Sequence, residues 1–266
     1  MRLAPLFAGV FACVFAATAS AHTPYLAPST FAPRAGDTVA LDASFAETFF
    51  VPETVFDNSH FTVTGPDGKE VALDGVQLLK VRAVGEYTLS KGTAGTYRFS
   101  TGPRPGALFR TWELNGKQES SRDPATKIPA GAKVLSNFQS LTLAETYVTV
   151  GEPGLAALQP RGKGIELVPT THPNDLFVGE TFDFTVQYDG KPLADQKVEV
   201  TEAVWTSDRK PQVVTVLTDA QGKASVKLER AGTWLALTRY RTRAPAGAPV
   251  DEYSNSYTLT FRVLEQ

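Results

Sequence analysis

Residues 181–188 read TFDFTVQY, and the alternation of apolar and polar side chains in this stretch decides the fold class of the chain. Phe182, Phe184 and Val186 fall on one face of an extended segment, and the polar residues between them fall on the other. Side chains of a β-strand point to opposite faces with a period of two, so the pattern predicts a strand with one buried face.

Stretches of similar pattern occur before and after this one, and turn sequences separate them. The turns include GPDG at 65–68, DG at 189–190 and QG at 221–222, which tolerate positive φ angles. A helical repeat is indicated only as a short turn near TLAETY at 142–147. We therefore expect an all-β fold made of antiparallel, Ig-like β-sandwiches. The other strand-like stretches are DTVALDASF (37–45), HFTVTGPDGKEVAL (60–73), GTYRFSTG (95–102), QKVEVTEAV (196–204), KASVKLERAGTWLALTRY (223–240) and YTLTFRV (257–263).

A segment rich in glycine and proline, GEPGLAALQPRGKGIEL at 151–167, interrupts the strand pattern. Such segments are typical of domain boundaries. We predict an N-terminal sandwich over 22–150 and a C-terminal Ig-like sandwich over 165–266. The polar, turn-rich stretch 104–133 lies within the first domain, and we interpret it as a solvated hairpin or a functional loop, to which we assign no chemistry.

Residues 1–21 have the pattern of a cleavable signal peptide, in which an apolar run precedes small residues. The run is shorter than the ~20 residues that a membrane-spanning helix needs, so we expect no membrane span in the mature chain. Cleavage after Ala21 makes His22 the first residue of the mature chain, whereas cleavage after Ala19 makes it the third.

The composition excludes several functional classes. The chain of 266 residues carries 26 Lys and Arg against 28 Asp and Glu, a formal net charge of −2, so it lacks the basic excess of a nucleic-acid-binding protein. Its single cysteine, Cys13, lies in the leader, which excludes zinc fingers and thiol chemistry in the mature chain. No Gly-x-Ser-x-Gly motif indicates a hydrolase.

The sequence contains three histidines, and His22 has the clearest potential for metal binding. As the first residue, it offers its α-amine and ring Nδ1 as a chelating pair, and a second imidazole would complete a histidine brace suited to copper. As the third residue, it forms with Ser20 and Ala21 a motif that can bind Cu(II) or Ni(II) in a square plane. The alternative is an ordinary frayed residue at a processed terminus.

His60 and His172 are the other candidate nitrogen ligands. His60 follows a turn and precedes a strand, where a surface histidine without a ligand role is also common. His172 precedes a proline, which restricts its backbone to extended conformations, and Asp175 follows closely enough to bind a metal or to orient the ring. A hydrogen bond at the domain junction would equally explain His172.

Two acidic residues flank an aromatic run near the first strands. Glu47 and Glu53 could add oxygen ligands, but half-exposed glutamates on strands are usually only solvated.

We therefore predict a metal site made by His22, His60, His172 and Asp175, at the interface of the two domains.

Several segments together resemble the DUF4198 family of secreted bacterial proteins, also described as periplasmic nickel-uptake-associated proteins of the NikM/NikK type. The resemblance implies a two-part β-sandwich protein of the periplasm that handles nickel, cobalt or iron. Tyr25 stands where the family often has tryptophan. The segments are AHTPYLAPSTFAPRAGDTV (21–39), FTVTGPDGKEV (61–71), AETYVTVGEPG (144–154), ELVPTTHPNDLFVGETFDFTVQYDGKPLADQKVEV (166–200), TDAQGKASVKLERAGTWL (218–235) and SYTLTFRV (256–263).

These observations favour a non-enzymatic accessory protein that captures nickel, cobalt, copper or iron, as an ion or a small complex, for a membrane uptake system. One alternative is a histidine-brace copper oxygenase acting on polysaccharide, although the sequence shows no flat aromatic substrate face. Another alternative is an Ig-like adhesion or structural module that binds no metal.

Overall fold

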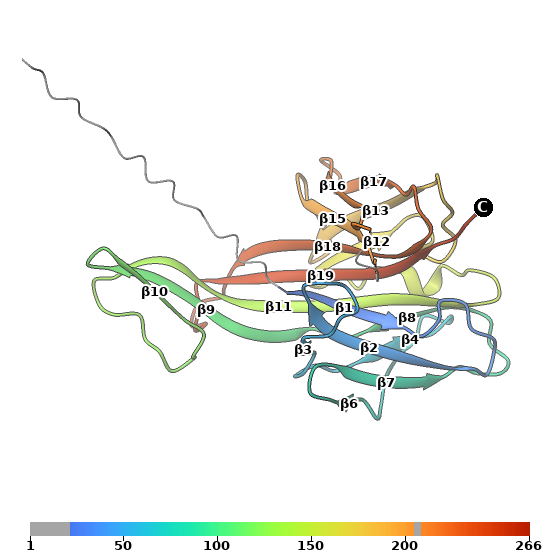
Figure 1. The fold of residues 1–266 in the computed structure, drawn as a ribbon, viewed down its shortest axis with the longest axis horizontal. Coiled ribbons are helices and arrows are strands. Elements are labelled where there is room, and N and C mark those ends of the chain that lie inside the picture. The colour runs from blue at the N-terminus through green and yellow to red at the C-terminus, as the bar shows by residue number, and fades with distance from the viewer. Residues whose placement is uncertain (1–21, 205–208) are drawn as a thin grey trace, which may run out of the picture.

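The computed structural model of the chain describes residues 22–204 and 209–266, which form three stacked β-sheets (Figure 1). The predicted signal peptide, residues 1–21, with its two possible cleavage sites lies outside the described residues, which begin at His22. The described part contains a single 3₁₀ turn, η1, as its helical element. The predicted all-β fold of packed sheets is therefore confirmed. No helix of the described residues could cross a bilayer.

The N-terminal sheet has five strands, in the order β1-β2-β7-β6 with β3 paired to the end of β2. Its strands are β1 (Thr23–Pro28), β2 (Thr38–Ala46), β3 (Thr54–Val55), β6 (Gln77–Leu78) and β7 (Ala83–Thr88).

The C-terminal sheet has four strands, with β13 at its centre. The stretch TFDFTVQY is β13, and the DG turn that follows it has positive φ at both residues, 48° at Asp189 and 73° at Gly190, as a tight hairpin requires. Its strands are β12 (Ile165–Pro169), β13 (Thr181–Tyr188), β14 (Lys191–Pro192) and β17 (Lys223–Lys227).

The central sheet has ten strands, of which eight follow the order β16-β15-β18-β19-β11-β8-β4-β5, while β9 pairs with the first part of β11 and β10 pairs with β9. The pairing of β11 with β19 is parallel, although antiparallel sheets were expected throughout. Its strands are β4 (Thr62–Thr64), β5 (Glu70–Ala72), β8 (Gly95–Ser100), β9 (Arg104–Leu114), β10 (Lys117–Ser121), β11 (Lys133–Val150), β15 (Lys197–Glu202), β16 (Val213–Leu217), β18 (Gly232–Arg243) and β19 (Glu252–Val263).

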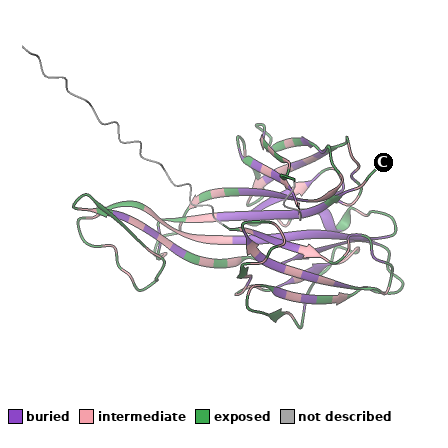
Figure 2. Ribbon diagram, viewed as in Figure 1, coloured by how far each residue is buried: buried purple, intermediate pink, exposed green. Residues whose placement is uncertain are grey.

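Strand β11 carries the connection between the layers. Leu143 and Tyr147 point into the core beneath the C-terminal sheet, whereas Ala144 and Val148 point into the core above the N-terminal sheet. The predicted helical turn at 142–147 is wrong, because hydrophobic partners cover both faces of this segment and neighbouring strands pair with both edges. The central sheet thus serves two cores, and burial is densest along its middle (Figure 2).

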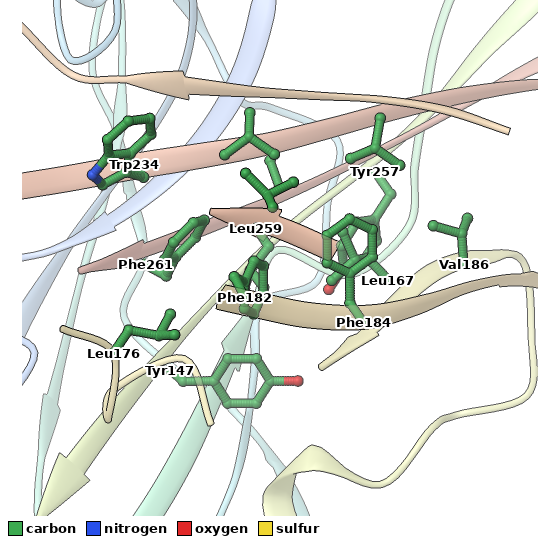
Figure 3. Packing of buried hydrophobic residues seen from close by; sticks show 14 of the residues in the cluster. Tyr147, Leu167, Leu176, Phe182, Phe184, Val186, Trp234, Tyr257, Leu259 and Phe261 are labelled. Carbon is green, nitrogen blue, oxygen red and sulfur yellow. The ribbon is translucent and has the colours of Figure 1, made fainter. Parts of the chain in front are cut away.

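The core beneath the C-terminal sheet is the largest of the three hydrophobic clusters of the described residues. Phe182 from β13 packs there against Phe261 of the central sheet, with ring centroids 4.7 Å apart, and Phe184 and Trp234 belong to the same cluster (Figure 3). Trp234 is fully buried, and its indole N–H donates to the carbonyl of Arg230 at 3.1 Å. The apolar side chains of residues 181–188 therefore face the core, as the sequence predicts.

The predicted domain ranges, 22–150 and 165–266, meet across this shared sheet. The segment between them contains η1 (Ala156–Leu158) and lies against β8 of the first range. Strand β11 of the first range pairs with β19 of the second over nine residues. The division into two domains stays a prediction. In the structure, both predicted ranges contribute strands to the same ten-stranded sheet.

One end of the central sheet extends beyond the other two sheets (Figure 1). We call this extension the arm and define it as residues 104–142 and 239–252. It contains β9, β10, the first half of β11 and the end of β18. The polar stretch 104–133 predicted as a hairpin or loop therefore includes two strands that lengthen the central sheet.

Candidate metal-binding site

Three potential metal ligands meet at one end of the N-terminal sheet. His22 immediately precedes β1, Glu47 immediately follows β2, and Glu53 immediately precedes β3. The register pairs Thr23 with Ala46 and Phe45 with Thr54, so the antiparallel pairing itself brings these three strand ends together. The position of the three residues is thus fixed by backbone hydrogen bonds.

The side chains lie close enough to share one cation. One ligand atom from each of His22, Glu47 and Glu53 lies within 4.8 Å of the other two. Nε2 of His22 is 2.8 Å from Oε2 of Glu53, and the main-chain N–H of Glu47 donates to the other oxygen of Glu53 at 2.9 Å. The N–H of Glu47 and, less strongly, His22 lower the pKa of Glu53. Glu53 is therefore ionised at neutral pH and available to a cation.

The loop that joins the two glutamates is anchored by aromatic residues. Phe49 and Phe50 pack against a small cluster that contains Tyr25 of β1, and the Tyr25 and Phe50 rings meet edge to face at 5.1 Å. Phe50 has a φ of 60°, an uncommon value for a non-glycine residue, so it reverses the chain tightly between the glutamates. This anchoring limits the movement of both carboxylates relative to His22.

The site remains open to solvent. The side chains of His22 and Glu53 are 42% and 37% exposed, so an incoming ion need not displace other protein groups. Imidazole nitrogen and carboxylate oxygen are both ligands that divalent transition metals accept. Nε2 of His22 faces Glu53. The other ring nitrogen, Nδ1, is the one that the predicted α-amine chelate would use.

The structure does not bring the other predicted ligands to this site. His60 is exposed between β3 and β4, and it belongs to no group of three potential ligands among residues 22–204 and 209–266. Asp175 is exposed, and its main-chain N–H donates to the carbonyl of His172 at 3.0 Å. Neither residue, nor His172, joins His22 in such a group.

His172 is only 9% exposed and lies in a polar seam, which we define as the hydrogen-bonded residues Thr96, Thr149, Gly154, His172 and Asn174. The main-chain N–H of Asn174 donates to Nδ1 of His172 at 3.1 Å, so the neutral ring carries its proton on Nε2 and donates to Oγ1 of Thr96 at 2.9 Å. Both ring nitrogens are thereby used within the protein. In this tautomer, His172 offers no lone pair to a metal.

Burial lowers the pKa of His172 below its ordinary value of 6.5, while the charge of Asp175 and the main-chain contact with Gly154 act in the opposite direction. The seam continues through Asn174, whose side-chain amide donates to the carbonyls of Phe31 and Tyr147 and to the hydroxyl of Thr149. The hydrogen bond between His172 and Thr96 joins the two predicted domain ranges, as the alternative interpretation of His172 expected.

A buried ion cluster lies in the same region. Glu145 on β11 is within salt-bridge distance of Arg161 and Arg98 and accepts a hydrogen bond from the hydroxyl of Tyr257 at 2.7 Å. Burial opposes ionisation of Glu145, but the two arginines outweigh it and lower its pKa. The cluster ties the segment after β11 to strands β8, β11 and β19.

Sequence reasoning underestimated the two glutamates. Their spacing of six residues across an aromatic loop at a strand end was visible, but the pairing of β1 with β2, which carries His22 to Glu47, was not. Asn174 was assigned no role from the sequence, whereas it makes three of the side-chain hydrogen bonds of the seam.

Comparison with known proteins gives a family and no function. A family model described as a domain of unknown function (DUF4198) matches residues 19–242. No curated protein matches the chain significantly. Among solved structures, the D0-D1 domain of intimin is 13% identical to this chain, with a TM-score of 0.22. The alignment covers 89% of this chain and 96% of that structure.

Two other solved structures are longer than this chain. The adhesin InvE of Yersinia pseudotuberculosis is 17% identical with a TM-score of 0.22, and 89% of this chain aligns with 58% of it. A DUF4785 family protein of Legionella pneumophila is 10% identical with a TM-score of 0.25, and 80% of this chain aligns with 50% of it. Likenesses at these scores contribute nothing to the functional argument.

Proposed function

The chain belongs to the DUF4198 family, and from that premise and the geometry of the site we propose that it is an exported, non-catalytic protein that captures a divalent transition-metal ion. The ion is bound by His22, Glu47 and Glu53. It is cargo for a membrane uptake system, and the protein works in the periplasm.

The convergence of three ligand-type side chains from three strand ends is the observation that supports this proposal most strongly. The 2.8 Å between Nε2 of His22 and Oε2 of Glu53 suits a shared proton, and it is also close to the separation of neighbouring ligands around one metal. A metal can therefore replace the proton with little movement. For nitrogen and oxygen ligands, affinity rises from iron through cobalt and nickel to copper.

Removal of the leader would allow a second arrangement, in which Glu53 orients the ring of His22 and does not itself bind the ion. If cleavage follows Ala21, the new α-amine and Nδ1 of His22 form a chelate, and Glu53 then holds Nε2–H and fixes the orientation of the ring. If the leader is cleaved elsewhere, the ring and the two carboxylates remain as ligands. Glu53 is required in both arrangements.

The test is a calorimetric titration of protein that begins at His22 with nickel, copper, cobalt and iron(II). We expect His22→Ala to lower affinity at least tenfold, about 1.4 kcal/mol, and Glu53→Gln to weaken binding as well. His60→Ala and Glu86→Gln are matched controls, because both residues are exposed and lie outside the site. Binding by the His22 and Glu53 variants that equals that of the unaltered protein would refute the proposal.

One further variant identifies the ligand atoms. A methionine added before His22 converts the α-amine into an amide but keeps the ring and both glutamates. A loss of affinity similar to that of His22→Ala assigns the amine as a ligand. Unchanged affinity assigns the site to the ring and the carboxylates.

A further inference from the structure

The last part of β18 carries three arginines on one face. Arg239, Arg241 and Arg243 occupy alternate positions, so their side chains point to the same side of the central sheet, and all three are exposed. The same face carries Leu235 and Leu237, which are buried against Tyr25 of β1. Strand β1 therefore covers this face up to Leu237, and the arm lies beyond the cover.

Stacked rings hold part of this surface in place. The Arg241 guanidinium lies 3.5 Å from the centre of the Phe138 ring, which stacks on Phe109 at 4.8 Å with 11° between the ring planes. Arg122 lies over Phe109 at 4.8 Å. Arg241 can reach Phe138 because Ser254, its register partner on β19, is small. Guanidinium groups held over aromatic rings lose less entropy when their N–H groups bind an anion.

The opposite face of the arm is covered. Arg110 points there and donates to the carbonyls of Pro124, Thr126 and Pro249, and Trp112 beside it is 4% exposed. The arginine face is thus the side of the arm that stays available.

The outer edge of the same strand segment is also open. Strand β15 pairs with β18 only up to Thr238, whereas β19 pairs with β18 up to Arg243. Among the described residues, no strand pairs with the other edge of 239–243, although the side chain of Gln196 donates to the carbonyl of Arg239 at 2.9 Å. An edge of this kind accepts an additional strand.

Charge separates along the molecule. The arm holds nine Lys and Arg against five Asp and Glu, whereas the whole chain holds 26 against 28. Two acidic groups interact with these arginines: the carboxylate of Glu252 is 3.5 Å from Arg241, and the charge of Glu199 acts on Arg239. They offset part of the charge, and the arm remains basic on an acidic protein.

We propose that residues 239–243 dock an extended acidic segment of a partner protein. The segment adds a strand to the free edge of β18, and its acidic side chains at alternate positions pair with Arg239, Arg241 and Arg243. The match is one of spacing, because alternate residues on both strands repeat every ~6.6 Å. A polypeptide fits better than a lipid surface, because only a polypeptide satisfies the main-chain groups of the edge. The inference does not depend on metal binding.

The test uses a fluorescent peptide of alternating glutamate and threonine, with anisotropy measured at low ionic strength on the protein that begins at His22. We expect Arg241→Glu together with Arg243→Glu to lower affinity at least tenfold. The control Lys163→Glu with Lys191→Glu changes the net charge by the same amount. These two residues are exposed and lie outside the arm, just before β12 and in β14, so the double variant should change affinity less than twofold. Circular dichroism melting verifies that each variant is folded.

A second peptide with the same composition but with its glutamates in one block should bind more weakly, because it cannot place a carboxylate at every second position. Equal loss of affinity in the arm variant and the control variant would overturn the proposal. So would binding to phosphatidylglycerol vesicles without binding to the alternating peptide. If neither binds, the arginines serve only to block strand pairing, and the proposal is also wrong. His22→Ala should leave peptide binding unchanged, which separates this test from that of the metal site.

Discussion

His22 and His172 are the same residue type in opposite surroundings. His22 stands at an exposed strand end, with one ring nitrogen beside a carboxylate that a metal can share. His172 is buried, with both ring nitrogens in hydrogen bonds to Asn174 and Thr96. The first histidine is arranged to accept a ligand, and the second is arranged to hold parts of the chain together.

The hydrogen-bond partners of the two residues explain this difference. The N–H that faces Nδ1 of His172 comes from its own turn, two residues later, and the turn is itself fixed through the amide of Asn174. Around His22, the neighbouring groups are carboxylates, which attract cations and leave the ring accessible. The chemistry of a histidine therefore follows from the groups that the fold places around it.

The largest effect that would test this contrast is loss of the buried ring. We expect His172→Ala to lower the free energy of unfolding by about 2 to 4 kcal/mol, because it leaves a cavity and removes hydrogen bonds to two buried groups. Urea denaturation followed by tryptophan fluorescence measures this change. Metal affinity should stay within twofold of the unaltered protein, and a large loss of affinity in a folded variant would contradict the structural role.

A smaller effect is expected from pH. Because the pKa of His172 is lower in the folded chain than its ordinary 6.5, the unfolded chain takes up a proton first as the pH falls. The contribution of His172 to the free energy of unfolding is therefore complete when the pH is above the ordinary pKa. This contribution is lost as the pH falls from the ordinary pKa towards the lower pKa of the folded chain. Urea denaturation at about pH 7.5 and about pH 5.5 should show lower stability at the lower pH, before carboxylates near their ordinary range contribute.

The comparison variant for the pH experiment is His172→Asn, which removes the titrating group. Its stability should depend less on pH over the same window than that of the unaltered protein. The same slope in both proteins would show that another group is responsible.

The smallest effect on stability is expected at the exposed site. His22→Ala should change the free energy of unfolding by less than about 0.5 kcal/mol, because the removed side chain is largely solvated and its ion pair is exposed. The measurement is the same denaturation experiment in the absence of metal, with His60→Ala as a second exposed histidine. A loss comparable to that of His172→Ala would mean that His22 serves the fold.

Prediction from the sequence succeeded where the pattern is local. The alternation at 181–188 predicted β13 and its buried face, and Asp189-Gly190 predicted the tight turn after it, because both depend on neighbouring residues alone. The segment at 142–147 was misread because its burial on both faces comes from two other sheets. Of the metal ligands predicted from the sequence, only His22 lies in the group that the structure assembles. Its partners, Glu47 and Glu53, were considered as oxygen ligands but were left out of the predicted site as solvated glutamates.

The sequence by itself determined that this protein is built from strands, where many of them turn, and which histidine stands next to the predicted cleavage site. Only the tertiary structure decided that β11 serves two cores, that β1 brings His22 to Glu47 and Glu53, and that His172 is enclosed in the seam. The physical reason is range. Strand periodicity and turn geometry are set by adjacent residues, whereas burial, hydrogen-bond partners and metal-ligand distances depend on residues that only strand pairing brings together.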